Sequence, residues 1–313
     1  MHINIGIIGL GKMGGGLALQ AMEKGIGVVG YTLDKPSSTL IEAGLQRAAE
    51  ISALKQLLPQ RRVVFIYVPA GKAVDAILEE LSNVLEKGDI VLDGGNSYWG
   101  DSMHRYHTLS QHGIHFIDLG TSGGVSGARQ GACFMAGGDR EPVEFVQKII
   151  EMLAVPGGFV YAGPPGAGHF TKLVHNGIEF GMLEAIGEGI DLLERWPHAE
   201  IATADVLKCW AHGSVIRSWL IELMEQAYRE HKGMEDIPPH VEDTGEVNWL
   251  VSDALKMEVP VPVISQSVNQ LFSSRDKQKR WARAIAMMRH GFGGHPYGPD
   301  AAIAEERRSG RVM

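Results

Sequence analysis

The feature that most constrains the fold of this chain is a glycine motif that directly follows a short apolar run near the N-terminus. Residues 3–8 are mostly apolar, and the chain continues with Gly9, Leu10, Gly11, Lys12, Met13 and Gly14. A strand, G-x-G-x-x-G and a helix form the phosphate-binding unit of dinucleotide-binding domains. The glycines permit a tight turn, close approach of the backbone to a pyrophosphate, and close helix–strand packing. We therefore favour dinucleotide binding over an ordinary glycine-rich turn.

Strand and helix patterns alternate through the first half of the chain. Strands are predicted at residues 3–8, 28–31, 63–68, 90–92, 115–119, 133–136 and 159–161, with helices after Gly14 and at 70–85, 98–111 and 142–153. Later segments are helical, at 167–195, 202–210, 216–230, 247–257, 261–272 and 276–288. Because 313 residues exceed what one core usually supports, we predict two domains. These are a doubly wound α/β Rossmann-type domain (1–165) and an all-α domain for substrate binding and oligomerisation (166–313).

The residues after the second predicted strand indicate which dinucleotide is bound. This segment contains Thr32, Leu33, Asp34 and Lys35. An acidic side chain here suits the ribose 2′-hydroxyl of NAD, whereas a cation suits the 2′-phosphate of NADP. Asp34 therefore predicts NAD as the cofactor, and Lys35 leaves NADP open. Val68 and Asn96, near the ends of two further strands, complete the predicted cofactor site.

A polar stripe marks the long predicted helix that begins at residue 167. Lys172, His175, Asn176 and Glu179 are spaced i, i+3, i+4 and i+7, which places them on one helix face. Lys172 and Glu179 would be separated by about 10 Å of axial rise. A base, an acid and two hydrogen-bonding groups on a rigid element suit a small polar substrate. The alternative is an ordinary solvated helix face.

Three further segments carry candidate substrate ligands. A polar loop follows the strand at 90–92 and contains Asn96. A glycine-rich loop over residues 120–131 contains Ser122, Gly123 and Gly124, and it suits a backbone cradle for a carboxylate or hydroxyl. The third segment is a predicted bend near the C-terminus, where Arg289 and His295 are placed to bind an oxyanion.

Composition excludes several classes of function. A net charge of −8 argues against nucleic-acid binding, which needs a basic face. The only two cysteines, Cys133 and Cys209, indicate no disulfide framework and a reducing compartment. No apolar run is long enough to span a membrane, and no cleavable leader is recognised. We predict a cytoplasmic protein with no membrane segment and no metal site.

These motifs resemble those of the β-hydroxyacid dehydrogenase superfamily, and specifically the short bacterial form of the 6-phosphogluconate dehydrogenase family. The resemblance covers nearly the whole chain. It rests on the N-terminal glycine motif, on Asp-Gly-Gly-Asn at 93–96, on Thr-Ser-Gly-Gly-Val-Ser-Gly at 121–127, on Lys-Leu-Val-His-Asn-Gly-Ile-Glu at 172–179 and on Arg-x-x-Phe-Gly-x-His at 289–295. The run at 172–179 is the most specific of these matches.

The resemblance implies a reaction and a role for each candidate residue. The substrate would be a sugar-acid phosphate, 6-phosphogluconate, oxidised and decarboxylated to ribulose 5-phosphate with reduction of NAD(P), a reaction of the pentose phosphate pathway. Lys172 would be the general base on the C3 hydroxyl, and Glu179 would protonate C1 of the enediol that remains after CO2 is lost. Substrate would be positioned by Asn96, Ser122, Gly123, Gly124, His175 and Asn176. Arg289 and His295 would reach a neighbouring subunit and bind the phosphate, which implies a homodimer or homotetramer.

Departures from the long family form leave two alternatives open. Phe180 replaces a tyrosine that helps to bind phosphate in that form, and the segment 243–249 lacks a cation seen there in relatives. The first alternative is therefore a non-decarboxylating hydroxyacid dehydrogenase that acts on gluconate or a hydroxyisobutyrate-like acid. The second is a catalytically silent dinucleotide sensor, which would need neither Lys172 nor Glu179. The end of the second strand also lacks the Asn-Arg-Thr triplet associated with NADP, which supports NAD.

Overall fold

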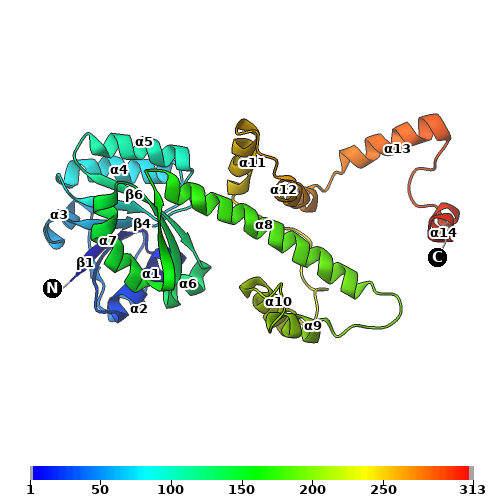
Figure 1. Cartoon of the computed structure of the whole chain (residues 1–313), viewed down its shortest axis with the longest axis horizontal. Coiled ribbons are helices and arrows are strands. Elements are labelled where there is room, and N and C mark those ends of the chain that lie inside the picture. Colours follow the sequence, from blue (N-terminus) through cyan, green and yellow to red (C-terminus); the bar gives the residue numbers. More distant parts are fainter. Residues whose placement is uncertain (1–2, 310–313) are drawn as a thin grey trace. The chain divides into compact units, whose positions relative to one another are not determined.

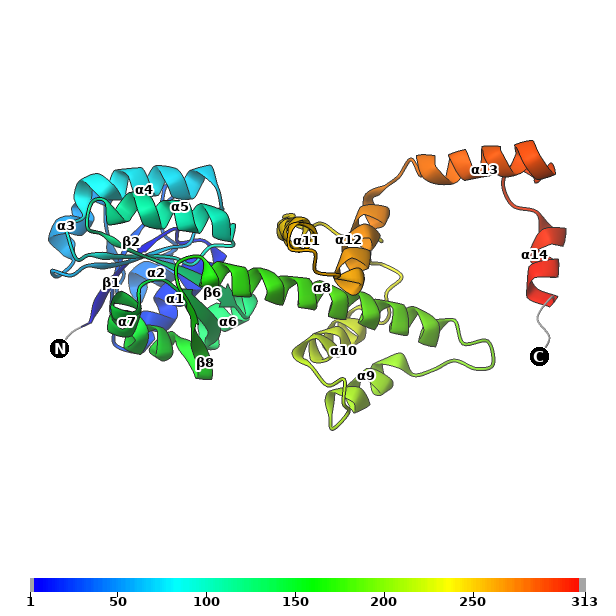
Figure 2. The ribbon, with the colours of Figure 1, turned by 45° about the horizontal axis from the view of Figure 1, so that its top comes forward.

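The chain divides into two compact units. A computed structural model describes residues 3–309, and Figures 1 and 2 show its elements from two directions. The first unit comprises Met1–Ala185 and Thr244–Ser265, and the second comprises Ile186–Asp243 and Gln266–Met313. The predicted domain boundary after residue 165 stays a prediction.

The first unit is built on one eight-stranded sheet. Its strands are β1 (Asn4–Ile8), β2 (Gly27–Tyr31), β3 (Gln46–Arg47), β4 (Val63–Ile66), β5 (Ile90–Asp93), β6 (His115–Ser122), β7 (Ala132–Gly137) and β8 (Ala154–Gly163). The spatial order is β3-β2-β1-β4-β5-β6-β7-β8, and every neighbouring pair is parallel except β6 with β7. This order confirms the predicted doubly wound Rossmann-type domain, in which ligands bind at the carboxyl ends of the strands.

Helices cover both faces of the sheet, so successive strand residues enter two separate cores. One face packs on α1 (Lys12–Glu23), α2 (Ser38–Glu42), α6 (Gly124–Gln130) and α7 (Arg140–Leu153). The other packs on η1 (Ile51–Ala53), α3 (Leu54–Leu57), α4 (Lys72–Val84) and α5 (Trp99–Ser110). In β1, Ile7 belongs to the first core and Ile8 to the second. Alternation of this kind follows from the two-residue repeat of a strand.

The glycine-rich segment 120–131 is not the loop that its composition predicts. Strand β6 continues to Ser122, which pairs with Cys133, and α6 follows at Gly124. A Cβ added at Gly16 of α1 would lie 3.0 Å from the Ala128 Cβ, so α6 packs closely on α1. This tertiary contact outweighs the low helix propensity of glycine. Prediction from pattern also missed four short elements (α2, β3, η1 and α3) and a C-terminal helix.

The remaining helices confirm the predicted all-α second half. They are α8 (Ala167–Glu194), α9 (Thr203–Ala211), α10 (Trp219–His231), α11 (Glu246–Lys256), α12 (Pro262–Arg275), α13 (Arg280–Gly293) and α14 (Ala301–Ser309). In the second unit, Ile190, Leu207 and Ile221 form a small core. Cys133 and Cys209 are free and exposed. Within residues 3–309, none of the helices has the length and apolar character needed to cross a membrane.

A buried carboxylate fixes the start of α8 against the sheet. Asp118 of β6 is 0% exposed, and its two oxygens accept hydrogen bonds from the backbone N–H groups of Gly166 and His169, both at 2.8 Å. A Cβ at Gly168 would lie 2.3 Å from the Asp118 carbonyl oxygen, so only glycine permits this approach. Asp118 thereby satisfies N–H groups that a helix start leaves unpaired and complements the helix dipole.

We predict that Asp118→Asn lowers the free energy of unfolding by about 2 to 4 kcal/mol, because an amide offers one acceptor and points N–H groups at a backbone donor. Denaturant titration measures this loss. Asp101→Asn, on an exposed position of α5, is the matched control and should change stability by less than about 0.5 kcal/mol. Equal stability of the two variants would contradict the anchoring role of Asp118.

Candidate active site

Two of the three motif glycines are required by the turn between β1 and α1. Gly9 has a φ of +90°, and a Cβ there would lie 2.3 Å from the Tyr67 carbonyl oxygen. A Cβ at Gly14 would lie 1.9 Å from the Gly9 carbonyl oxygen. Neither position tolerates a side chain, so these glycines bring the first turn of α1 against the ends of β1 and β4.

The second motif glycine leaves room for a ligand. A Cβ at Gly11 would meet no atom within 4 Å. Helix α1 begins at Lys12, with no side chain capping its N-terminus and no acidic residue in its first turn. An uncapped helix start with open space beside it suits a phosphate group. Residues 9–14 therefore fit the pyrophosphate of a dinucleotide, which would bind along the backbone from Leu10 to Met13.

The predicted adenosine contacts lie beyond β2 and β4. Thr32, Leu33 and Asp34 follow β2, and Asp34 and Lys35 are both exposed. Val68 follows β4, on the neighbouring side of β1. All of these residues lie at the carboxyl edge of the sheet, where dinucleotides bind in this type of fold. Their individual roles stay predictions.

The polar stripe of α8 forms a contiguous set of side chains. Lys172 and Asn176 are buried, and the side chains of His175 and Glu179 are each 40% exposed. The Lys172 Nζ lies 3.3 Å from the His175 Nδ1, and that nitrogen lies 3.3 Å from the Asn176 Oδ1 and 3.8 Å from the Glu179 Oε2. On the other side of the ring, the His175 Nε2 lies 3.1 Å from the Ser122 Oγ. The structure thus brings the predicted base, the acid and Ser122 together around His175.

Burial gives Lys172 the electrostatic character of a base. The residue is 8% exposed, and this desolvation lowers the pKa of Lys172, against the opposing negative charges of Glu179 and Glu246. Desolvation and the nearby Lys172 charge also lower the pKa of His175. A lowered pKa increases the fraction of neutral amine at a given pH, and only the neutral amine can accept a proton.

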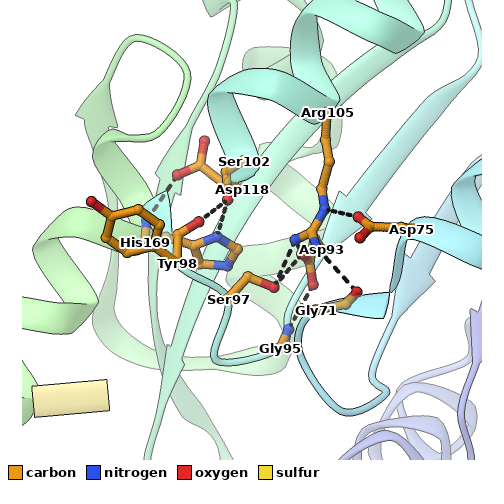
Figure 3. A network of polar contacts seen from close by, with 10 residues as sticks. All are labelled: Gly71, Asp75, Asp93, Gly95, Ser97, Tyr98, Ser102, Arg105, Asp118 and His169. Atoms are coloured by element: carbon orange, nitrogen blue, oxygen red, sulfur yellow. Dashed lines mark hydrogen bonds and ion pairs between the residues drawn. The ribbon is translucent and has the colours of Figure 1, made fainter. Parts of the chain in front are cut away.

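The loop that carries Asn96 is held by a buried ionic network, shown in Figure 3. Asp93 accepts hydrogen bonds from the Ser97 Oγ at 2.7 Å and the Gly95 N–H at 3.1 Å. The Arg105 guanidinium contacts Asp93, Ser97 and the exposed Asp75. The loop therefore has a defined conformation.

Helix α11 supplies a wall of the site that motif analysis missed. Glu246, its first residue, accepts a hydrogen bond from the Asn96 Nδ2 at 2.5 Å. The buried Asp253 fixes the helix by accepting hydrogen bonds from the Tyr98 Oη at 3.1 Å and the Trp99 Nε1 at 2.8 Å. A cleft is lined by Asn96, Ser97, His169, Lys172, Leu173, Asn176, Glu246 and Trp249. The departure of segment 243–249 from the long family form was the available signal.

Arg289 and His295 belong to the second unit. Arg289 lies on α13, and His295 follows the end of that helix. The His295 carbonyl oxygen lies 2.8 Å from the His290 Nδ1, which holds the bend after α13. Their predicted part in phosphate binding stays a prediction.

Comparison with known proteins covers both halves of the chain. Residues 4–163 match the model of the NAD binding domain of 6-phosphogluconate dehydrogenase, and residues 168–303 match that of the 6-phosphogluconate dehydrogenase C-terminal domain. A Bacillus subtilis protein, named provisionally as a 6-phosphogluconate dehydrogenase, is 40% identical over 294 residues, 94% of this chain and 98% of its own length. The NAD(+)-dependent, decarboxylating 6-phosphogluconate dehydrogenase of Haloferax volcanii is 36% identical over 94% of this chain and 98% of its own.

A solved structure has the same fold over most of the chain. The 6-phosphogluconate dehydrogenase of Plasmodium falciparum, studied with NADP+ and with 6-phosphogluconate, superposes with a TM-score of 0.81 at 26% identity. The match covers 95% of this chain and 66% of the Plasmodium chain.

The two kinds of motif glycine predict opposite outcomes for the same substitution. Gly14→Ala should lower the free energy of unfolding by about 2 kcal/mol, because its methyl group meets a backbone oxygen. Gly11→Ala should leave stability within about 0.5 kcal/mol and weaken NAD binding about tenfold, because its methyl group occupies the open space. Denaturant titration and calorimetric titration with NAD measure the two effects. Unchanged NAD affinity in Gly11→Ala would contradict the assigned pyrophosphate site.

Proposed function

Because the chain belongs to the 6-phosphogluconate dehydrogenase family, we propose that it oxidises and decarboxylates 6-phospho-D-gluconate to ribulose 5-phosphate and CO2, with NAD as the electron acceptor and NADP as a weaker one. The observation that carries this proposal is the buried Lys172, with its lowered pKa, on the same helix face as Glu179. A sensor of dinucleotides needs neither group, so the site supports an enzyme.

Lys172 begins the reaction by taking the proton of the C3 hydroxyl. The bound nicotinamide supplies the hydride acceptor for C3. Loss of the proton and the hydride leaves a ketone at C3, β to the carboxylate at C1. The ammonium of Lys172 then lies beside the ketone oxygen, where its charge stabilises the electrons released when CO2 leaves. Burial strengthens this interaction because little water competes with it.

Glu179 completes the reaction by protonating the carbon that has lost CO2. It lies two helix turns beyond Lys172, and the His175 ring lies between the two groups. A simple oxidation would need no acid at this distance from the base. The same geometry therefore supports decarboxylation over the hydroxyisobutyrate-like alternative.

The other polar groups have positioning roles in this proposal. His175 and Asn176 contact the substrate from α8, and Ser122, Gly123 and Gly124 offer a hydroxyl and backbone N–H groups where β6 meets α6. Asn96 faces the same cleft from the loop after β5. Binding of substrate to Asn96 would replace its hydrogen bond to Glu246.

One observation favours the second candidate, oxidation of an unphosphorylated acid such as gluconate. Glu246 places a carboxylate in the cleft, where a phosphorylated substrate would bring further negative charge. Like charges at short distance are unfavourable in a partly buried site. The two candidates differ in their products, since the second releases no CO2.

An apolar stripe on α13 supports a homo-oligomer. Trp281, Ile285, Met288 and Phe292 are spaced by four, three and four residues and are each at least 45% exposed in the chain. Apolar side chains at this spacing lie on one face of a helix and usually pack against another surface. A second copy of the chain would cover this face and bring Arg289 and His295 to a neighbouring site. The reducing compartment inferred from cysteine content supports a cytoplasmic location.

Lys172→Arg tests the general base. The guanidinium stays protonated, so kcat should fall by roughly 10²- to 10⁴-fold. In the wild type, kcat/KM should fall as pH drops and Lys172 takes up its proton, with an apparent pKa below that of an ordinary lysine. Initial rates of NADH formation across pH measure both effects. A variant that keeps wild-type kcat would contradict the role of Lys172.

Glu179→Gln tests the acid. It should slow the overall reaction by about 10²-fold or more, because protonation of the carbon that has lost CO2 loses its donor. The control is Glu188→Gln, an exposed position on the same helix, which should retain wild-type rates. Quenched-flow assay of ribulose 5-phosphate gives the comparison. Equal rates in both variants would rule out Glu179 as the acid.

Met288→Asp tests the oligomer. A charge in the apolar stripe should reduce the assembly to the mass of a single chain, as measured by light scattering, and should lower activity with 6-phosphogluconate. Arg283→Asp, on the opposite face of α13, should keep the assembly intact. An unchanged mass for Met288→Asp would show that the stripe is not the interface.

A further inference from the structure

His169 is a buried polar side chain that the reaction described above leaves without a role. It lies one turn before Lys172 on the same face of α8 and is 1% exposed. Its Nδ1 lies 2.7 Å from the Ser102 Oγ, and Figure 3 draws this contact as a dashed line. Among the described residues, its Nε2 has no hydrogen-bond partner. A buried unpaired nitrogen is costly and calls for a partner.

The contacts of Ser102 bear on which nitrogen of the imidazole carries the proton. We assign the single proton of the Ser102 Oγ to the Tyr98 carbonyl oxygen, a group 3.2 Å away that can only accept. In this assignment Ser102 accepts from the His169 Nδ1, which carries the proton. The Nε2 is then a lone-pair acceptor, and its partner must be a hydrogen-bond donor.

The position of His169 narrows the choice of donor. His169 lines the cleft with Asn96, Lys172 and Asn176. Its own N–H is bound to Asp118 of β6, so its backbone lies against the sheet. Carboxylate and phosphate groups are acceptors, so they cannot satisfy Nε2. Apart from water, the donors that can enter this cleft are a hydroxyl of the substrate and the carboxamide NH2 of a nicotinamide.

The direction of cofactor approach favours the carboxamide. A dinucleotide lies along the carboxyl edge of the sheet. Its nicotinamide must reach the carbon whose hydroxyl Lys172 deprotonates, and it must therefore reach Lys172 from the sheet side. His169 precedes Lys172 by one turn of α8, toward the contact with Asp118 of the sheet, whereas Glu179 follows Lys172 by two turns.

We propose that His169 positions the cofactor by accepting, at Nε2, a hydrogen bond from the carboxamide NH2 of the nicotinamide. This contact would fix which face of the ring is turned toward the substrate. The inference rests on the proposed function to the extent that it requires nicotinamide dinucleotide binding. It requires neither decarboxylation nor a phosphorylated substrate.

The test compares NAD with its 3-acetylpyridine analogue, in which a methyl group replaces the carboxamide NH2. Calorimetric titration gives both dissociation constants without turnover. The wild type should bind NAD about tenfold more tightly than the analogue, as expected for one buried hydrogen bond. His169→Phe should bind the two ligands within about twofold of each other. His169→Gln, which keeps an acceptor, should retain part of the preference.

Two further variants keep the test decisive. Ser102→Ala removes the partner that holds the proton on Nδ1, so its preference for NAD should also fall, even if His169→Phe does not fold. His107→Phe, at an exposed position on α5, should retain the wild-type preference. Thermal melts establish that each variant is folded.

The results that would contradict the proposal can be told apart from one another. A wild-type preference that persists in His169→Phe and Ser102→Ala overturns the proposal, as does a wild type without any preference. Unchanged cofactor preference with weaker 6-phosphogluconate binding in His169→Phe would assign Nε2 to a substrate hydroxyl instead. Failure of the wild type to bind either dinucleotide would overturn the proposed function as well.

Discussion

The pair of hydrogen bonds from the start of α8 to Asp118 is the interaction on which the rest of the site depends. It joins the long helix to the sheet at β6, and the glycines at 120, 137 and 168 permit the close contact. This junction fixes the position of α8, and the helical rise then sets how far each candidate residue lies along the helix from the sheet. The junction thereby fixes the position of Lys172 relative to the edge of the sheet where the dinucleotide binds.

The candidate site contains ionisable side chains whose burial costs free energy. Lys172 is desolvated enough to lower its pKa, and Asp93, Asp118 and Asp253 each receive two or more hydrogen bonds in return for their burial. A buried charge without such partners would destabilise the fold by several kcal/mol. The carboxylates therefore serve as supports for the loop after β5, for the start of α8 and for α11.

Sequence predicted the repeating parts of this structure and missed the parts made by distant contacts. The strands, the glycine turn and the α8 stripe have local signatures, and the structure places them as expected. The helix at 124–130 forms because it packs on α1, and no local pattern reveals that contact. Glu246 enters the cleft from a segment 150 residues beyond Asn96, so its role required the fold. Asp118 offered a weak signal, as a charged residue between the apolar Ile117 and Leu119 of a strand.

The most direct test of this account is the stoichiometry of the wild-type reaction. NADH and CO2 would be followed together with 6-phosphogluconate and with gluconate, each with NAD and with NADP. The account predicts equal amounts of reduced cofactor and CO2 from 6-phosphogluconate, with NAD preferred. Reduction without CO2, or a preference for gluconate, would contradict it, and the carboxylate of Glu246 in the cleft would then explain the rejection of the phosphate.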